Sequence, residues 1–476
     1  MPWNGIIQRL RFQKSLLNLA IGALGILLVS LQVHAGPRTA FVHLFEWPWK
    51  DVALECENYL GPAGFAAVQV SPPHEHIRTQ NSPWWERYQV VSYKLESRSG
   101  NEAEFIDMVQ RCKKAGVDIY ADAILNHMTG MAGGNGLSGT PYSHYDYSPL
   151  YSYADFNHCS LNGNDDIQNY SNRYEVQNCE LLDLADLATG SEKVRNTLAN
   201  YLNHLLDLGV TGFRLDAAKH IPAVDLAAIK AKLKRPAYIY QEVIYNPGCP
   251  IQYNEYFSVG DVMAYDFPHI LARGFQHKDT NSLLHIADGF PASDSSVIFV
   301  TNHDLERGGG VLSFNSSQQP LYRLAQIFMM AWPYGYPQIF SGYQFNDMNA
   351  GPPVGSDFRT LSVLDSKSLC KAPWTCEHRL PEVAAMVNFR NQTDNTFRVD
   401  HWWSNGQDLV AFSRGQNGFV AINFSTNPIT RTFSTTMSPG TYCNILEGHC
   451  NEHFTVENGF VSVIFPPLSA VVLLKN

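Results

Sequence analysis

The chain has 476 residues, which is enough for two or three domains or for one large α/β domain with additions. Its 45% hydrophobic and 16% charged residues exclude an intrinsically disordered chain. The net charge of −10 at pH 7, with no run rich in Lys and Arg, argues against a nucleic-acid partner.

The start of the chain has the pattern of a secretion signal. Arg9, Arg11 and Lys14 precede an apolar run over 16–31, and small residues follow that run. The run is slightly short for a membrane span of about 20 residues, and no later run resembles one. We predict a cleaved signal peptide over 1–35 rather than an uncleaved anchor. The protein is therefore expected to be secreted, extracellular and free of the membrane after signal removal.

The chain contains nine cysteines, an odd number, and a secreted chain can oxidise them. Cys370 with Cys376, and Cys443 with Cys450, are near enough in sequence to close small loops. Spacing alone does not assign the others. The sequence has no CxxC pair and no HExxH motif, so it gives little support to a zinc site.

The clearest strand and helix unit covers residues 101–125. Asn101 can cap a helix whose first turn is acidic, and Phe105, Val109 and Cys112 share one face of that helix. Gly116 suits the end of the helix, and the run VDIYADAIL predicts a strand directly after it.

The same order of helix and strand recurs over 191–216 and 222–243, and further strands are expected near 261–267, 296–304 and 336–342. Strands that alternate with helices predict parallel pairing with right-handed crossovers. Because the pattern continues from about residue 41 to 345, it favours a (β/α)8 TIM barrel over a doubly wound sheet, both of the α/β class.

Two regions depart from this pattern. Residues 128–186 are rich in Gly, Asn, Ser, Tyr and Asp and have no helical period, which is typical of a functional loop or a small inserted domain. After about residue 395, short alternating runs are separated by turn residues. Those runs predict an antiparallel β-sandwich.

Polar residues follow four of the expected strands. The four sets are Asn126 with His127, Arg214 with Asp216, Glu242, and Asn302 with His303 and Asp304. In a parallel barrel the carboxyl ends of the strands surround one mouth, so three acids would meet there. The alternative, that each acid is an ordinary surface or capping residue, holds for most acids taken singly but not for three in equivalent places.

Three carboxyl groups suit the cleavage of a glycosidic bond. One must be ionised to attack the anomeric carbon, and one must hold a proton for the leaving oxygen. Asp216 lies two residues from Arg214, which favours its charged form, whereas Glu242 lies in an apolar run that could raise its pKa. We therefore expect Asp216 to be the nucleophile and Glu242 the acid/base.

Four ordered stretches resemble the motifs of the α-amylase family, glycoside hydrolase family 13. They are DAILNHM, GFRLDAAKH, QEVI and FVTNHD. Together with HLFEW, GFAAVQVSPP and PWWERYQVVSYKL, they are similar to the animal-type branch, and the resemblance extends over nearly all of the chain after Gly36.

The resemblance implies a (β/α)8 barrel with an inserted loop-rich domain after the third strand and a C-terminal Greek-key β-sandwich. It places the barrel over 36–127 and 187–390, the inserted calcium-binding domain over 128–186, and the sandwich over 391–476. It further implies a monomer that hydrolyses internal α-1,4-glucosidic bonds of α-glucan polysaccharides such as starch and glycogen, with retention.

The resemblance also implies roles for individual residues. By motif position Asp216 is the nucleophile, Glu242 the acid/base, and Asp304 the third catalytic acid. The implied substrate-binding residues are Trp84, Trp85, Tyr88, His127, Arg214, Lys219 and His303.

A calcium site is implied as well, since Ca²⁺ prefers carboxylate, amide and carbonyl oxygens. The expected ligands are the side chains of Asn126 and Asp186 and the backbone carbonyls of Gln177 and His220. The implied disulfides are Cys56–Cys112, Cys159–Cys179, Cys370–Cys376 and Cys443–Cys450, with Cys249 unpaired.

One departure from the family pattern concerns chloride, which animal-type members bind between two Arg and an Asn. Arg214 and Asn302 match two of these ligands, but Gln338 stands at the third position. Because a neutral amide removes one of two cations, we expect at most a residual chloride site and no chloride requirement.

Three rival functions remain open at this point. A transglycosylase would use a sugar instead of water as the acceptor, and an α-glucosidase would act on shorter α-glucans. A non-catalytic carbohydrate-binding protein would be expected to lack at least one of the three acids, yet all three are present.

Overall fold

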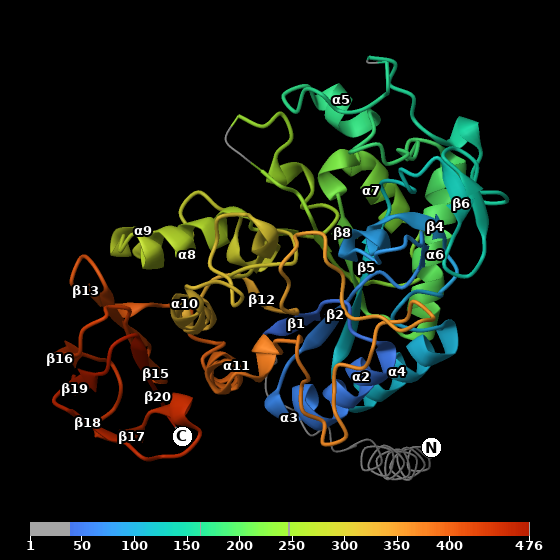
Figure 1. The fold of residues 1–476 in the computed structure, drawn as a ribbon. Coiled ribbons are helices and arrows are strands. Elements are labelled where there is room, and N and C mark those ends of the chain that lie inside the picture. The colour runs from blue at the N-terminus through green and yellow to red at the C-terminus, as the bar shows by residue number, and fades with distance from the viewer. Residues whose placement is uncertain (1–38, 162, 246–247, 476) are drawn as a thin grey trace, which may run out of the picture. The chain divides into compact units, whose positions relative to one another are not determined.

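The computed structural model describes residues 39–161, 163–245 and 248–475 (Figure 1). The predicted signal peptide over 1–35 lies outside the described residues. Within the described part of the chain, no helix is long and apolar enough to cross a membrane.

Eight parallel strands form a closed barrel, as the alternating pattern predicts. Phe41 in the first strand pairs with Gln338 of the last strand and with Ala67 of the second, which closes the ring. The strands are β1 (Phe41–Leu44), β2 (Ala67–Val70), β5 (Asp118–Ile124), β8 (Gly212–Asp216), β9 (Tyr238–Gln241), β10 (Asp261–Met263), β11 (Ser296–Ile298) and β12 (Tyr336–Ser341).

Helices connect the strands and surround the barrel (Figure 1). The predicted helix after Asn101 is α4, and Asn101 and Glu104 cap each other's backbone N–H groups. Phe105, Val109 and Cys112 are buried on its inner face, as expected. The main helices are α2 (Trp49–Glu55), α4 (Glu102–Lys114), α6 (Glu192–Leu208), α7 (Ala223–Lys230), α8 (Asp266–Gln276), α10 (Gln319–Ala331) and α11 (Pro381–Gln392).

Aromatic side chains fill part of the barrel interior. The ring centroid of Phe41 lies 5.5 Å from that of Tyr120 and 5.5 Å from that of Tyr240. Such packing makes the barrel a solid core rather than a pore, so any site must lie at the ends of the strands.

The segment between β5 and α6 consists mostly of loops with short elements, namely β6 (Gly133–Asn135), β7 (Pro141–Ser143), η3 (Tyr153–Asp155) and α5 (Arg173–Asn178). Its two ends lie side by side. The N–H of Met128 donates to the carbonyl of Ala185 at 2.9 Å, and the N–H of Leu187 donates to that of Asn126 at 2.9 Å.

The C-terminal region forms two four-stranded antiparallel sheets, which confirms the predicted all-β region. Leu409 and Phe419 of one sheet share an apolar cluster with Phe433 and Val463 of the other. The strands are β13 (Asp400–Ser404), β14 (Leu409–Arg414), β15 (Gly418–Asn423) and β20 (Ser469–Leu474) in the first sheet, and β16 (Ile429–Ser434), β17 (Gly440–Cys443), β18 (His453–Glu457) and β19 (Phe460–Phe465) in the second.

Four disulfides are present in the described residues, and Cys249 is unpaired. They confirm all four pairings that the family resemblance implies: Cys56–Cys112, Cys159–Cys179, Cys370–Cys376 and Cys443–Cys450.

Candidate active site

The guanidinium group of Arg214 is the centre of the site at the carboxyl ends of the strands. Its side chain is 1% exposed, and its Nη1 atom lies 2.8 Å from Asp122 Oδ1 and 2.8 Å from Asp216 Oδ1. Its Nη2 atom lies 3.1 Å from Glu242 Oε2. A single cation therefore contacts carboxyl groups from β5, from β8 and from the residue that follows β9, which agrees with the prediction that the strand ends meet at one mouth.

Asp122 is the member of this set that the sequence analysis missed. It pairs in register with Arg214 across β5 and β8, and its carboxylate accepts two contacts from Nη1, at 2.8 and 3.0 Å. The signal was present, because a lone acid inside an apolar strand needs a buried cation, and Arg214 was available on the neighbouring strand.

Two hydrogen bonds fix the carboxylate of Glu242. The N–H of Ala217 donates to Oε2 at 2.8 Å, and the hydroxyl of Tyr265 donates to Oε1 at 2.7 Å. Ala217 follows β8 with φ 48°, a left-handed conformation that is costly for a residue with a side chain. Asn302 Nδ2 in turn donates to the Tyr265 hydroxyl at 3.1 Å.

The pKa directions correct the expectation drawn from sequence neighbours. Burial raises the pKa of Asp216 well above its usual value, and the shared charge of Arg214 does not offset this. Burial also acts to raise the pKa of Glu242, but Arg214, the Ala217 N–H and the Tyr265 hydroxyl outweigh it, so that pKa is lowered. The sequence predicted the reverse order, because Arg214, Ala217 and Tyr265 were not recognised as partners of Glu242.

Asp304 lies at the mouth beside His303, whose Nε2 is 3.4 Å from Asp304 Oδ2. Burial and then the charge of Glu242 raise the pKa of Asp304 to about 7, although 38% of its side chain remains exposed. The His303 ring stacks on Tyr88 at 5.2 Å with an interplanar angle of 8°. Burial lowers the pKa of His303 well below its usual value, so the ring is neutral at pH 7.

Tyr88 connects the aromatic side of the site to the acids. Its hydroxyl donates to Asp122 Oδ2 at 3.2 Å, and its backbone carbonyl accepts from His127 Nε2 at 3.0 Å. Trp84 and Trp85 are partly exposed, and their indole N–H groups donate to Met348 O at 2.9 Å and to Asn349 Oδ1 at 3.2 Å. Because these N–H groups are engaged, the rings are held in place for stacking.

A cavity of about 380 Å³ opens next to Glu242. Lys219 and His220 also line it, so the structure places Lys219 beside the acid/base candidate. The remaining lining residues are Tyr170, Leu181, Ala217 and Ile244.

Asp186 is the strongest candidate for a calcium ligand. Its side chain is buried, and Asn157 Nδ2 donates to its Oδ2 at 2.7 Å. Asn126 also hydrogen-bonds to Asp186 through its side chain. No Lys, Arg or His nitrogen of residues 39–161, 163–245 and 248–475 forms an ion pair with this carboxylate, so a buried charge with amide neighbours fits a bound cation.

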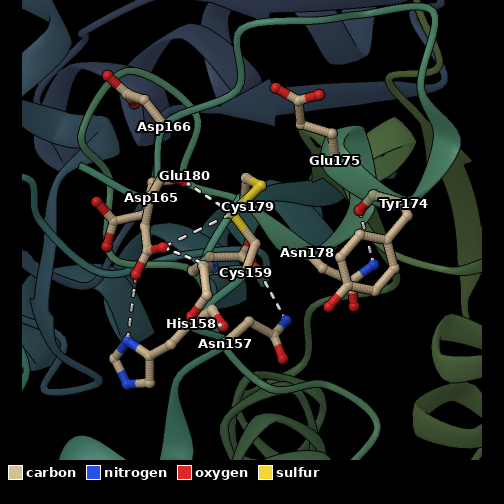
Figure 2. Close-up of a disulfide and its surroundings, with 12 residues drawn as sticks. Asn157, His158, Cys159, Asp165, Asp166, Tyr174, Glu175, Asn178, Cys179 and Glu180 are labelled. Carbon is tan, nitrogen blue, oxygen red and sulfur yellow. Dashed lines mark hydrogen bonds and ion pairs between the residues drawn. A yellow bond between two sulfur atoms is a disulfide. The ribbon is translucent and has the colours of Figure 1, made fainter. Parts of the chain in front are cut away.

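The two expected backbone ligands also lie close to each other. His220 Nδ1 donates to the carbonyl of Val176, next to Gln177, at 2.9 Å. The Cys159–Cys179 disulfide ties α5, which carries Gln177, to the preceding loop, as Figure 2 shows. The expected ligands thus come together as two pairs, Asn126 with Asp186 and Gln177 with His220.

The three residues of the chloride comparison lie in one buried network. Asn302 Oδ1 accepts from the backbone of Asp304 at 3.1 Å and of Leu305 at 2.8 Å. Gln338 Nε2 donates to Gln69 Oε1 at 2.5 Å. The amide of Gln338 is therefore engaged, and it supplies no second cation beside Arg214.

Comparison with known proteins decides the family. Residues 55–242 match the model "Alpha amylase, catalytic domain", and residues 402–476 match "Alpha amylase, C-terminal all-beta domain". An α-amylase of Pecten maximus is 42% identical over 440 residues, covering 86% of this chain and 85% of that protein. The chain belongs to the α-amylase family.

Further α-amylases agree with this assignment. One from Tenebrio molitor is 42% identical over 437 residues, covering 87% of this chain and 90% of that protein. The crystal structure of α-amylase I from Eisenia fetida superposes with a TM-score of 0.85 at 33% identity, covering 92% of this chain and 97% of that one. The chain is thus a glycoside hydrolase with the α-amylase function.

Proposed function

We propose that the chain hydrolyses internal α-1,4-glucosidic bonds of starch, glycogen and related polysaccharides by a double-displacement mechanism that retains the anomeric configuration. Asp216 attacks the anomeric carbon, Glu242 protonates the leaving oxygen and then activates water, and Asp304 holds sugar hydroxyls. The observation that carries the proposal is the shared guanidinium of Arg214, which contacts both Asp216 and Glu242.

In this mechanism a proton moves within the acid set when the glucan binds. The free site favours a proton on Asp216 over one on Glu242. The developing positive charge at the anomeric carbon favours ionised Asp216, and the glycosidic oxygen needs the proton on Glu242.

The substrate is proposed to lie along the aromatic side of the mouth. Trp84, Trp85 and Tyr88 would stack on sugar rings, His127 and His303 would bond hydroxyls, and Lys219 would contact the leaving-group side. A crystal structure of the Eisenia fetida enzyme is a complex with maltohexaose, which supports a linear α-glucan as the substrate.

Calcium is proposed as a structural ion held by Asn126, Asp186 and the carbonyls of Gln177 and His220. It would supply no chemistry to the reaction, but it would join the segment 128–186, proposed as an inserted domain, to the barrel. We further propose that the chain is secreted after removal of residues 1–35, which the four disulfides support. We also propose that it acts as a monomer. We also propose that the enzyme does not require chloride.

The test is the digestion of starch by the wild type and by Glu242→Gln, with the anomeric form of fresh product followed by NMR. We expect α-configured product and a loss of about 10²–10⁴-fold in kcat for the variant. Equal activity of the two proteins would contradict the role of Glu242, and β-configured product would contradict the role of Asp216.

The same preparation separates the rival functions. A transglycosylase would yield longer glucans at high substrate concentration, and an α-glucosidase would fail on oligosaccharides blocked at the non-reducing end. We expect chain shortening in the first assay and cleavage in the second.

A further inference from the structure

Two buried carboxyl groups outside the catalytic set have no cationic partner in the described part of the chain. Glu306 belongs to the turn η7 (Leu305–Arg307), two residues after Asp304, and Glu377 begins the turn η8 (Glu377–Arg379). Within the described residues neither forms an ion pair with a Lys, Arg or His. Glu306 Oε2 and Glu377 Oε1 are both buried without a hydrogen-bond partner in that part of the chain.

Both carboxyl groups lie against the backbone of Gly342, the residue that follows β12. The N–H of Gly342 donates to Glu377 Oε2 at 3.2 Å. A methyl group placed on Gly342 would lie 3.5 Å from Glu306 Oε2. Both groups therefore lie beside this glycine, and the charge of Glu377 acts on Glu306 through space.

The surrounding groups do not neutralise the pair. Arg307 directs its Nη1 to the carbonyl of His303 at 2.7 Å and its Nη2 to the hydroxyl of Tyr343 at 3.1 Å. Tyr322 faces the pair from α10, and its hydroxyl accepts a hydrogen bond from Gln326 at 2.8 Å.

Among the residues that the structure describes, Asn315 is the one side chain that hydrogen-bonds to Glu306, with its Nδ2 donating to Oε1 at 2.7 Å. Burial and then the charge of Glu377 raise the pKa of Glu306 to about 8. Burial raises the pKa of Glu377 to about 6, against the hydrogen bonds that it accepts. Two ionised carboxylates in this position would repel each other with little screening, so one proton between them lowers the free energy of the fold.

We propose that Glu306 and Glu377 together carry one proton rather than two negative charges and act as positioning residues, which hold η7, and with it Asp304, against the end of β12. The backbone supports this coupling, because the N–H of Glu306 donates to the carbonyl of Asn302 at 3.0 Å. Loss of this proton at alkaline pH then loosens the turn that carries Asp304. The effect on Asp304 rests on the proposed function, whereas the retained proton does not.

The first test is the pH dependence of thermal stability of the full chain for wild type, Glu306→Gln and Glu377→Gln. The folded pKa of Glu306 is raised, so the stability from its proton is complete below the usual pKa near 4.5 and is lost as pH rises through about 8. An amide keeps the shape and needs no proton. We expect the melting temperature of Glu306→Gln minus that of the wild type to rise by about 3 °C between pH 6 and pH 9.

Glu457→Gln, at an exposed position in β18, is the matched control. Its curve of melting temperature against pH should be parallel to that of the wild type. Parallel curves for Glu306→Gln and Glu377→Gln as well would overturn the proposal. It would equally fail if both were less stable at every pH and bound one calcium fewer, because the pair would then hold a cation.

The second test is the pH profile of kcat/KM on starch. The wild type should lose kcat/KM above about pH 8, and Glu306→Gln should keep more of it there while matching the wild type at pH 6. If the stability curves differ as expected but the kcat/KM profiles coincide, the positioning of Asp304 is disproved, although the proposed catalytic acids are untouched by that result.

Discussion

The interior of the C-terminal sandwich and the mouth of the barrel are both buried, yet the first contains apolar side chains and the second contains charged ones. Between the two C-terminal sheets the shared cluster is apolar, with Phe433 and Val463 among its members. At the barrel mouth, Arg214 and Asp122 are buried with two further acids around them. Buried ion pairs contribute little net stability, whereas apolar packing contributes much. Buried ion pairs also occur away from this site, such as Arg87 with Glu46, but at the barrel mouth one cation gathers three carboxyl groups, which suits chemistry more than stability.

Replacing the central cation should have the largest effect. Arg214→Met leaves three buried carboxyl groups without a counter-charge, so we expect a loss of about 10³-fold in starch hydrolysis and of about 3–5 kcal/mol in the free energy of unfolding. Activity assays and thermal denaturation measure both. Arg431→Met, at an exposed position of β16, should leave the activity unchanged and lower the free energy of unfolding by at most about 1 kcal/mol, because the Arg431 guanidinium lies 4.1 Å from the centroid of the Trp403 ring. Retention of a substantial part of the activity by Arg214→Met would contradict the central role of this residue.

Truncation in the sandwich should cost as much stability but no chemistry. Phe433→Ala removes a side chain that is 3% exposed, and we expect a loss of about 3–5 kcal/mol with kcat of the folded enzyme unchanged. Phe460→Ala, where the ring is 51% exposed, is the control and should stay within about 0.5 kcal/mol of the wild type. A drop in kcat for Phe433→Ala would show that the two regions are not independent.

Calcium removal should have an intermediate effect on stability, and that effect should come from the barrel rather than from the C-terminal sandwich. With calcium at about 100 times its dissociation constant, chelation should lower the wild-type stability by about 2.7 kcal/mol, as measured by melting temperature. Asp186→Asn should start near the chelated wild type and respond little. Asp183→Asn, an exposed acid in the same segment, should respond as the wild type does. Full chelator sensitivity of Asp186→Asn would place the ion elsewhere.

Chloride should have the smallest effect. Because Gln338 supplies no second cation, dialysed enzyme should show no several-fold gain in activity on addition of sodium chloride over sodium gluconate at equal ionic strength. A several-fold gain specific to chloride would show that Arg214 and Asn302 suffice for anion binding.

The sequence predicted what is encoded locally or by repetition. The helix after Asn101 follows from its cap and its apolar face, and the barrel follows from the recurrence of such units. The pairing of Arg214 with Asp216 follows from strand alternation. These features need only neighbours in the chain.

What the sequence left unpredicted depends on contacts between distant residues. Asp122 belongs to the site because β5 lies next to β8. Against the effect of burial, the pKa of Glu242 is lowered by the charge of Arg214 and then by hydrogen bonds from the Ala217 N–H and from Tyr265 at the start of α8. Glu306 and Glu377 come from two different turns and both lie beside Gly342. Neither the amino-acid composition nor the spacing of apolar residues along the chain shows which distant residues come into contact.

The adjacent backbone hydrogen bonds of Met128 and Leu187 have a consequence for how the molecule could be rebuilt. The chain leaves the barrel and rejoins it at neighbouring points, so the inserted segment does not have to bridge a set distance and its length can vary. We expect that lobe to tolerate exchange for a longer or shorter one while the eight strands keep their register, which makes it a natural place for grafting.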